Sequence, residues 1–220
     1  MLKAAIFDMD GLLVDTEPCW KHTEREIFAR YGIEITPEMQ LDATLGLQTR
    51  EVILHWYNQK PWDNFSPEEL ANEFYGRIEK KIKEDAQLMD GAEEILRFFR
   101  KMDYKVGLAS SSPLRLIETF LDRFNLKNQF DTYQTSENEA FGKPHPAVYI
   151  ATATSLGVNP VECIAFEDSF NGLLSAKAAR MKTVVVPDES HFNDPGFAIA
   201  DLKLASLQMF NASHLNQLMD

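Results

Sequence analysis

Four short apolar runs recur along the chain without the polar alternation of a half-exposed strand. They cover residues 4–7, 106–109, 163–166 and 183–186. Such runs are typical of strands that are buried on both faces of a parallel sheet. Helical patterns separate the later runs: residues 114–124 follow Ser112 and Pro113, an expected N-cap and first-turn proline, and residues 147–156 follow Pro146. This alternation predicts an α/β fold with a Rossmann-like, doubly wound parallel sheet.

The interval between the first two runs is too long for one crossover connection. It contains helical patterns at residues 19–31 and 48–59, and a third helix that Ser66 is expected to cap. No part of the interval has a convincing strand pattern. We therefore predict a catalytic core with an inserted small α-helical cap domain. The predicted bounds are 1–14 and 89–220 for the core and 15–88 for the cap.

Composition limits the partners that the protein can have. The 220 residues are 45% hydrophobic, enough for a buried core, and carry a formal charge of -12. Because that charge repels anionic phosphates, neither nucleic acid nor a membrane is an expected partner. Cys19 and Cys163 lie far apart in no metal-binding motif, which predicts ordinary thiols. With no signal-like or membrane-spanning stretch, we expect a cytoplasmic protein, and nothing demands more than a monomer.

Carboxylates and a hydroxyl directly follow three of the apolar runs. Asp8 and Asp10 follow the first run, Ser110 follows the second, and Glu167 and Asp168 follow the third. In open α/β sheets, ligands bind outside the carboxyl ends of the strands, so these side chains are expected to meet at one edge. Oxygen ligands from two strand ends suit an octahedral Mg²⁺ ion. Taken alone, the Glu167 and Asp168 pair is also a common way to begin a helix.

The spacing of Asp8 and Asp10 places two carboxylates in one small volume. Residues two apart on an extended chain point to the same side, and Gly11 allows a sharp exit behind them. Two adjacent carboxylates persist only where a cation neutralises them or one holds a proton, and both conditions serve phosphoryl transfer. The segment is also a common loop composition, but Leu12 stands where an EF-hand requires a ligand.

Lys143 lies in a stiff loop between Gly142 and Pro144, just before a helical pattern. A rigid loop would aim its ammonium group, whereas most lysines are solvated at the surface. Of the serines that follow the second run, Ser110 is the better candidate to donate to a phosphate oxygen, because Ser112 is expected to cap the next helix.

These segments, in this order, resemble the four motifs of the haloacid dehalogenase-like hydrolases. The helical insertion after the first motif resembles the small cap of that family, of the β-phosphoglucomutase and phosphoglycolate phosphatase type. Residues 17–20, 44–47 and 176–181 are further similar to a group of sugar phosphatases within it. The matching motif residues are 8–15, Ser110, Lys143 with Pro144, and Glu167, Asp168 and Ser169 with Asn171 and Gly172.

The resemblance implies a magnesium-dependent phosphatase that hydrolyses small sugar or polyol phosphates. It implies that Asp8 is the nucleophile, which becomes an aspartyl-phosphate, and that Asp10 is the general acid and then the base. It also implies that Mg²⁺ is held by Asp8, the backbone carbonyl of Asp10 and Asp168, with Glu167 assisting. This agrees with the charge that phosphoryl transfer must neutralise.

The resemblance implies two further groups of binding residues. The phosphoryl group would be bound by Ser110, Lys143 and the backbone N–H groups of Met9 and Ser111. On the cap, the expected substrate contacts are Trp20, Gly46, Leu47 and Arg50. Alternatively, Trp20, Trp56 and Trp62 form the core of the cap itself.

Other classes of protein fit the sequence less well. A sugar phosphomutase of the β-phosphoglucomutase type shares Asp15 and Thr16 but carries a histidine where Trp20 stands, which favours a hydrolase. A receiver-like phosphorylation switch carries its aspartate on an internal strand and has no cap of this size. An inactive binding module is expected to have lost at least one of Asp8, Asp10, Lys143 and Asp168.

Overall fold

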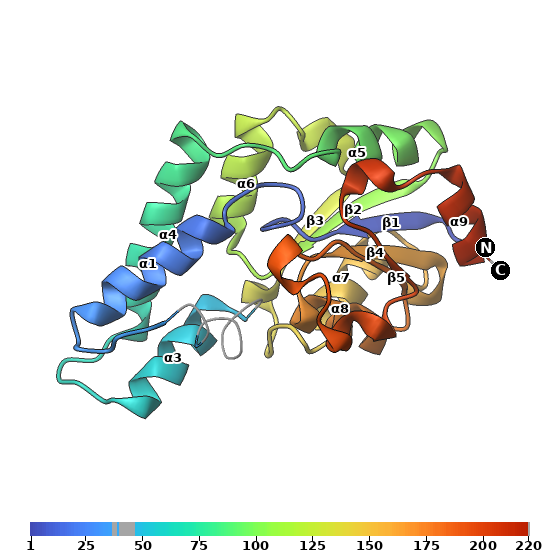
Figure 1. Ribbon diagram of the computed structural model, residues 1–220. Coiled ribbons are helices and arrows are strands. Elements are labelled where there is room, and N and C mark those ends of the chain that lie inside the picture. The colour runs from blue at the N-terminus through green and yellow to red at the C-terminus, as the bar shows by residue number, and fades with distance from the viewer. Residues whose placement is uncertain (37–38, 40–46, 220) are drawn as a thin grey trace.

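Six parallel strands form one sheet in the computed structural model, which describes residues 1–36, 39 and 47–219 (Figure 1). The order across the sheet is β3-β2-β1-β4-β5-β6. The strands are β1 (Ala4–Phe7), β2 (Lys105–Ser110), β3 (Thr132–Thr135), β4 (Cys163–Glu167), β5 (Lys182–Val185) and β6 (Leu202–Lys203). The four predicted strands are β1, β2, β4 and β5, and the two that were not predicted lie at the edges. The predicted Rossmann-like α/β fold is confirmed.

Helices cover both faces of the sheet because its strands are apolar on both sides. In β1, Ala5 and Phe7 belong to the core on one face, whereas Ala4 and Ile6 belong to the core on the other. The first face is covered by α5 (Ala92–Lys101), α6 (Leu114–Arg123) and α9 (Ala212–Met219). The second is covered by α7 (Ala147–Ser155) and α8 (Phe170–Ala178). The sheet is therefore doubly wound.

Among the described residues, three further helices project from the carboxyl edge of the sheet (Figure 1). These cap helices are α1 (Glu17–Ala29), α3 (Thr49–Gln59) and α4 (Pro67–Glu84). They share a separate apolar core around Phe28, Trp56 and Phe74. The Ser66 hydroxyl accepts from the Glu69 N–H at 3.3 Å, so the predicted N-cap of α4 is confirmed. The boundaries of the inserted domain stay a prediction.

Short 3₁₀ helices connect the larger elements. They are η1 (Lys127–Gln129), η2 (Ser136–Asn138), η3 (Pro160–Glu162), η4 (Glu189–His191), η5 (Pro195–Ile199) and η6 (Leu207–Met209). Both cysteines have free thiols. Within the part of the chain that the structure describes, no helix has the length and apolarity to span a bilayer.

Candidate active site

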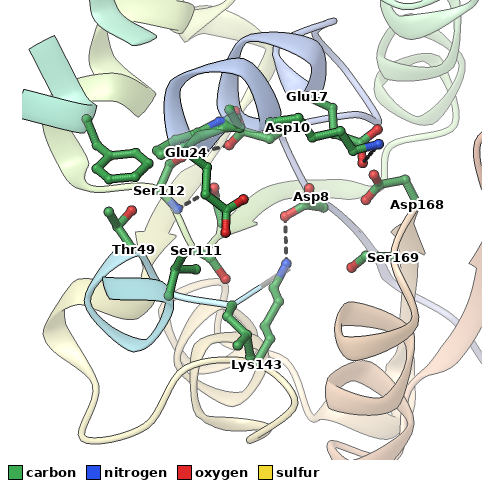
Figure 2. Close-up of a pocket in the computed structure, with 16 residues that line it drawn as sticks. Asp8, Asp10, Glu17, Glu24, Thr49, Ser111, Ser112, Lys143, Asp168 and Ser169 are labelled. Atoms are coloured by element: carbon green, nitrogen blue, oxygen red, sulfur yellow. Dashed lines mark hydrogen bonds and ion pairs between the residues drawn. The ribbon is translucent and has the colours of Figure 1, made fainter. Parts of the chain in front are cut away.

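A cavity lies between the carboxyl ends of the central strands and the cap helices. Strand β1 stands between β2 and β4, where the strand order reverses, which is the position at which open α/β sheets bind ligands. The core contributes Asp8, Asp10, Ser110, Ser111, Ser112, Lys143, Asp168 and Ser169 (Figure 2). The cap side contributes Glu17, Trp20, Lys21, Glu24, Leu47, Thr49, Val52 and Phe74. The strand-end residues therefore meet in one place, as expected.

The ammonium group of Lys143 is buried between two carboxylates. The side chain is 2% exposed, and Nζ lies 2.6 Å from both Asp8 Oδ1 and Glu167 Oε1. It also donates to the Ala109 carbonyl at 3.1 Å. Burial opposes the charge, but the carboxylates of Asp8 and Glu167 outweigh it and raise the pKa of Lys143. The lysine is thus a fixed cation, aimed at Asp8 as the stiff loop predicted (Figure 2).

Asp8 and Asp168 face an excess of negative charge. Burial raises the pKa of Asp8 to about 8, with Glu167 and Asp10 adding to the rise and Lys143 opposing it. Burial and the charges of Asp8 and Glu167 likewise raise the pKa of Asp168 well above its usual range. One lysine therefore does not compensate the group fully, and a second cation would stabilise the ionised carboxylates.

Glu167 is held in place through both of its oxygens. Its Oε1 accepts from Lys143 and, at 2.6 Å, from the Tyr149 hydroxyl. Its Oε2 accepts from the Asp168 N–H and the Ser169 hydroxyl, both at 3.3 Å. A carboxylate with this many donors orients its neighbours, which fits an assisting role better than that of a principal metal ligand.

Three hydrogen-bond donors fix the carboxylate of Asp10. Thr16 Oγ1 and Trp20 Nε1 donate to Oδ1 at 2.5 and 3.0 Å, and Ser112 Oγ donates to Oδ2 at 2.7 Å. The prediction that Ser112 caps the next helix is wrong, because α6 begins at Leu114 and Pro113 occupies its N-cap position. Ser112 instead links the end of β2 to Asp10.

The turn after Asp10 depends on a glycine. Gly11 has φ +78°, and a Cβ at this position would lie 2.2 Å from Asp168 Oδ2. Residues with a Cβ rarely adopt this backbone conformation, and the overlap would displace the carboxylate. The glycine therefore lets the loop that carries Asp10 pass close to Asp168.

The carboxylate oxygens of Asp8, Glu167 and Asp168 fit a divalent metal ion. One oxygen from each lies within 4.8 Å of the others. Oxygen-only donors with net negative charge are the set that Mg²⁺ binds, usually with several waters retained. The acidic cluster can thus hold the metal that the sequence predicts.

Of the remaining predicted site residues, some line the cavity and others lie elsewhere. Ser110 and Ser111 line the cavity, whereas the Met9 side chain is buried in the apolar core, so only the Met9 backbone is left for the expected phosphate contact. Trp20 and Leu47 line the cavity from the cap side. Arg50 is exposed and borders a second cavity between α3, α4 and the segment after β3. Gly46 lies outside the described residues.

The sequence interpretation missed several supporting residues. They are Thr16, Ser112, Tyr149 and Glu24. Tyr149 lies inside α7, and no local pattern marks it. The spacing of Thr16, Trp20 and Glu24 could have indicated that α1 directs one face towards the first motif.

Comparison with known proteins agrees with the geometry. The model of the family described as haloacid dehalogenase-like hydrolase matches residues 5–186. Hexitol phosphatase B of Escherichia coli is 42% identical over 212 residues, which cover 96% of each chain. The sugar phosphatase group that the sequence resembles is that of hexitol phosphatase B, so the narrower resemblance is confirmed.

Solved structures share the fold over the whole chain. CbbY from Rhodobacter sphaeroides, in complex with phosphate, has a TM-score of 0.87 at 24% identity, covering 98% of this chain and 100% of that one. A β-phosphoglucomutase from Clostridium difficile has a TM-score of 0.85 at 25% identity, covering 99% and 97%. The fold alone therefore does not distinguish a hydrolase from a mutase, and the residues of the site must do so.

Proposed function

The chain belongs to the haloacid dehalogenase-like hydrolase family, and we propose that it hydrolyses small sugar or polyol phosphates through an aspartyl-phosphate on Asp8. The observation that carries the proposal is the convergence of Asp8, Asp10, Lys143 and Asp168 on one cavity. The relative named hexitol phosphatase B supports a phosphorylated polyol as substrate. The protein is accordingly a phosphatase, and the metal, the intermediate and the substrate are the proposed parts.

The proposed reaction has two displacements at phosphorus. A carboxylate oxygen of Asp8 forms a bond to phosphorus while the bond to the sugar oxygen breaks, and protonated Asp10 gives its proton to that leaving oxygen. Asp10 then takes a proton from water, whose oxygen attacks phosphorus and breaks the bond to Asp8. Inorganic phosphate leaves, and both aspartates return to their initial states.

Positive charge beside Asp8 supports its role as nucleophile. An attacking carboxylate must be ionised, whereas burial raises the pKa of Asp8 to about 8. Lys143 opposes that rise and would also pair with the phosphoryl oxygens. Mg²⁺ held by Asp8 and Asp168, with Glu167 assisting, would neutralise further charge. Ser110 and the backbone N–H groups of Met9 and Ser111 would donate to the same oxygens.

Trp20 favours hydrolysis over the alternative phosphomutase reaction. A mutase must keep its aspartyl-phosphate from water until a second sugar phosphate arrives. Here the side chain at position 20 is an indole that donates to Asp10 and borders the cavity, and an indole cannot exchange protons as an imidazole does. The site therefore has no imidazole at this position, which favours a hydrolase over a phosphomutase.

Phosphate release from a panel of sugar and polyol phosphates tests the proposal. We would compare the wild type with Asp8→Asn and Asp10→Asn, in excess Mg²⁺ and in chelator. Asp122→Asn is a matched control, because Asp122 is exposed on α6 and does not line the cavity. We expect metal-dependent release by the wild type and the control, and a loss of at least about a thousandfold in both site variants.

Two results would contradict the proposal. Interconversion of glucose phosphates in the presence of a sugar bisphosphate, without phosphate release, would assign the mutase reaction. Undiminished activity of Asp8→Asn would exclude an aspartyl-phosphate at that position.

A further inference from the structure

The residue just before α3 joins the cap helices to the core. Gln48 Nε2 donates to the Ser136 carbonyl at 2.6 Å, a bond between residues 88 positions apart. Ser136 is fully buried and begins η2, directly after β3. The backbone of Gln48 is held in turn, because its N–H donates to Glu51 Oε2 at 3.0 Å. The start of α3 is therefore fixed to the carboxyl edge of the sheet.

Gly142 leaves the space that this contact needs. Its φ is not positive, so its backbone conformation does not require a glycine. A Cβ at position 142 would lie 2.6 Å from Gln48 Cγ and 2.8 Å from Glu51 Oε2. Carbon atoms pack favourably at about 3.5–4.0 Å, so a larger residue would displace the start of α3. The close approach of Gln48 thus accounts for the glycine beside Lys143.

This contact joins two walls of the catalytic cavity. Leu47 and Thr49, on either side of Gln48, line the cavity from the cap. Lys143, which follows Gly142 directly, lines it from the core (Figure 2). Gln48 itself borders the second cavity. A change at Gln48 would therefore move the two walls relative to each other without removing a group from the catalytic cavity.

A shift of α3 would reach Asp10 through the apolar core of the cap helices. Ile53 and Trp56 of α3 belong to that core, and Trp20 of α1 packs against it. Packed interiors transmit displacements because they contain few voids. Since the Trp20 indole donates to Asp10, the place at which α3 rests on the core affects how Asp10 is held.

A second contact attaches the cap through a different helix. Arg115 of α6 donates to the Asn72 carbonyl at 3.4 Å, and its guanidinium lies 5.1 Å from the centre of the Tyr75 ring. Asn72 and Tyr75 both belong to α4. Loss of the Gln48 bond would thus tilt the cap rather than release it.

We propose that Gln48 is a positioning residue for Asp10. Through its bond to the Ser136 carbonyl and its fit against Gly142, it holds the cap where Trp20 donates to Asp10. The inference rests on the proposed function and adds a residue that lies outside the catalytic cavity. A misplaced general acid slows proton transfer to the leaving oxygen, so loss of the bond should lower kcat more than it changes KM.

Substitutions at Gln48 test the role of its N–H group. Gln48→Met keeps the length of the side chain without a donor, whereas Gln48→Lys keeps a donor. We expect kcat to fall about fivefold in Gln48→Met, with KM within about twofold, and to return to within about twofold of wild type in Gln48→Lys. Gln217→Met, at an exposed position on α9, is the control and should leave kcat unchanged. Tm should stay within about 4 °C throughout.

Gly142→Ala tests the same contact from the core. The added Cβ would overlap Gln48 Cγ, so we expect kcat to fall as it does in Gln48→Met. Gln48→Ala lacks that atom, so Gly142→Ala should cost little when it is made in the Gln48→Ala protein. If Gly142→Ala instead acted directly on Lys143, the loss would be equal in both backgrounds.

The position of Trp20 can be measured without activity. Subtracting the fluorescence of a Trp20→Phe counterpart leaves the signal of Trp20 in each protein. Because a tilted cap opens the cavity that Trp20 borders, acrylamide should quench this signal more strongly in Gln48→Met than in the wild type or the control.

Three results would overturn the inference: wild-type kcat in Gln48→Met, an equal loss from Gly142→Ala in both backgrounds, or unchanged quenching of Trp20 in Gln48→Met. A loss of kcat that accompanies a large fall in Tm would assign Gln48 to folding alone and overturn it too. The proposed function fails separately, if the wild type releases phosphate from no member of the panel. The quenching measurement then still decides whether Gln48 holds the cap.

Discussion

Asp10 is held more firmly than a solvent-exposed carboxylate, and the proposed reaction requires this. The group must face the leaving oxygen and later a water molecule, and Thr16, Trp20 and Ser112 restrict it from two sides. Two of these donors come from the start of the cap and one from the core. The orientation of Asp10 is therefore sensitive to how the cap sits on the sheet.

Removing the Trp20 donor tests whether the orientation of Asp10 matters for the reaction. In Trp20→Phe an aromatic ring is kept beside Phe74 and Tyr75, but the N–H donor to Asp10 is lost. A hydrogen bond that orients Asp10 contributes about 1.5 kcal/mol, so we expect kcat to fall about tenfold with a smaller change in KM. Steady-state kinetics on the preferred substrate measures both constants.

A second tryptophan supplies the control. Trp62 packs against the cap core and does not line the cavity, so Trp62→Phe removes an indole without touching Asp10. Its kcat is expected to stay within about twofold of wild type. If Trp20→Phe and Trp62→Phe behave alike, the indole of Trp20 serves packing only.

The ionic residues of the site could be predicted from sequence, but the groups that orient them could not. Asp8, Asp168 and Lys143 stand at strand ends or in a rigid loop, where position alone suggests function. Tyr149 and Trp20 reach the site from helices, where only the tertiary fold reveals their contacts. Ser112 precedes a proline, which is a common pattern for a helix N-cap. Its hydroxyl instead donates a hydrogen bond to Asp10, 102 positions away in the sequence.

The degree of burial determines which strands can be predicted from the sequence. The central strands β1 and β4 are buried along their whole length, and apart from Glu167 at the end of β4 they consist of apolar residues. The edge strand β3 has the sequence Thr-Tyr-Gln-Thr and is mostly half-buried, and β6 has only two residues. Edge strands pair on one side and need little apolar surface, so their pattern resembles a loop.

The loop after β1 yields a prediction about a backbone position. In Gly11→Ala the new Cβ would meet Asp168 Oδ2 in a left-handed conformation that costs about 1–2 kcal/mol for a residue with a side chain. We expect a loss of stability of that order and a weaker apparent affinity for Mg²⁺, because the Asp168 carboxylate must move. Urea unfolding and the Mg²⁺ dependence of activity measure the two effects.

Gly76 is the matched control for this substitution. It lies on the exposed face of α4, and a Cβ there meets nothing within 4 Å. Alanine favours the helix over glycine by about 0.5–1 kcal/mol, so Gly76→Ala should stabilise the protein and leave Mg²⁺ dependence unchanged. An unaltered Mg²⁺ affinity in Gly11→Ala would argue against Asp168 as a metal ligand.

The whole molecule carries a large net negative charge. The formal charge is -12, and the acidic cluster adds a local excess at the edge of the sheet. Bound Mg²⁺ would reduce both the global and the local repulsion. Metal binding should therefore stabilise the fold in addition to serving the reaction, because a ligand that binds only the folded state raises its stability.

The pH dependence of that stabilisation follows from Asp8. Its pKa is raised to about 8 in the folded protein, from an unfolded value near 3.8. Between these values the folded state retains a proton that the unfolded chain has released, so the stability of the metal-free protein falls as pH rises through this window. Mg²⁺ binds the ionised form and competes with the proton. The increase in Tm that Mg²⁺ produces should thus be larger at about pH 8 than at about pH 6.

Thermal unfolding with excess Mg²⁺ and with chelator, at both pH values, measures this difference. Asp8→Asn is the control that separates Asp8 from the general charge of the molecule, since its amide neither titrates nor offers an anionic ligand. We expect the metal-free variant to lose much of the pH dependence and to gain less from Mg²⁺. Repulsion among the other acidic groups is unchanged in this variant, so any difference from the wild type comes from Asp8. An equal Mg²⁺ effect on Tm at both pH values in the wild type would mean that proton and metal do not compete at Asp8. The metal would then have to be held by other groups, and the proposed arrangement around the nucleophile would be wrong.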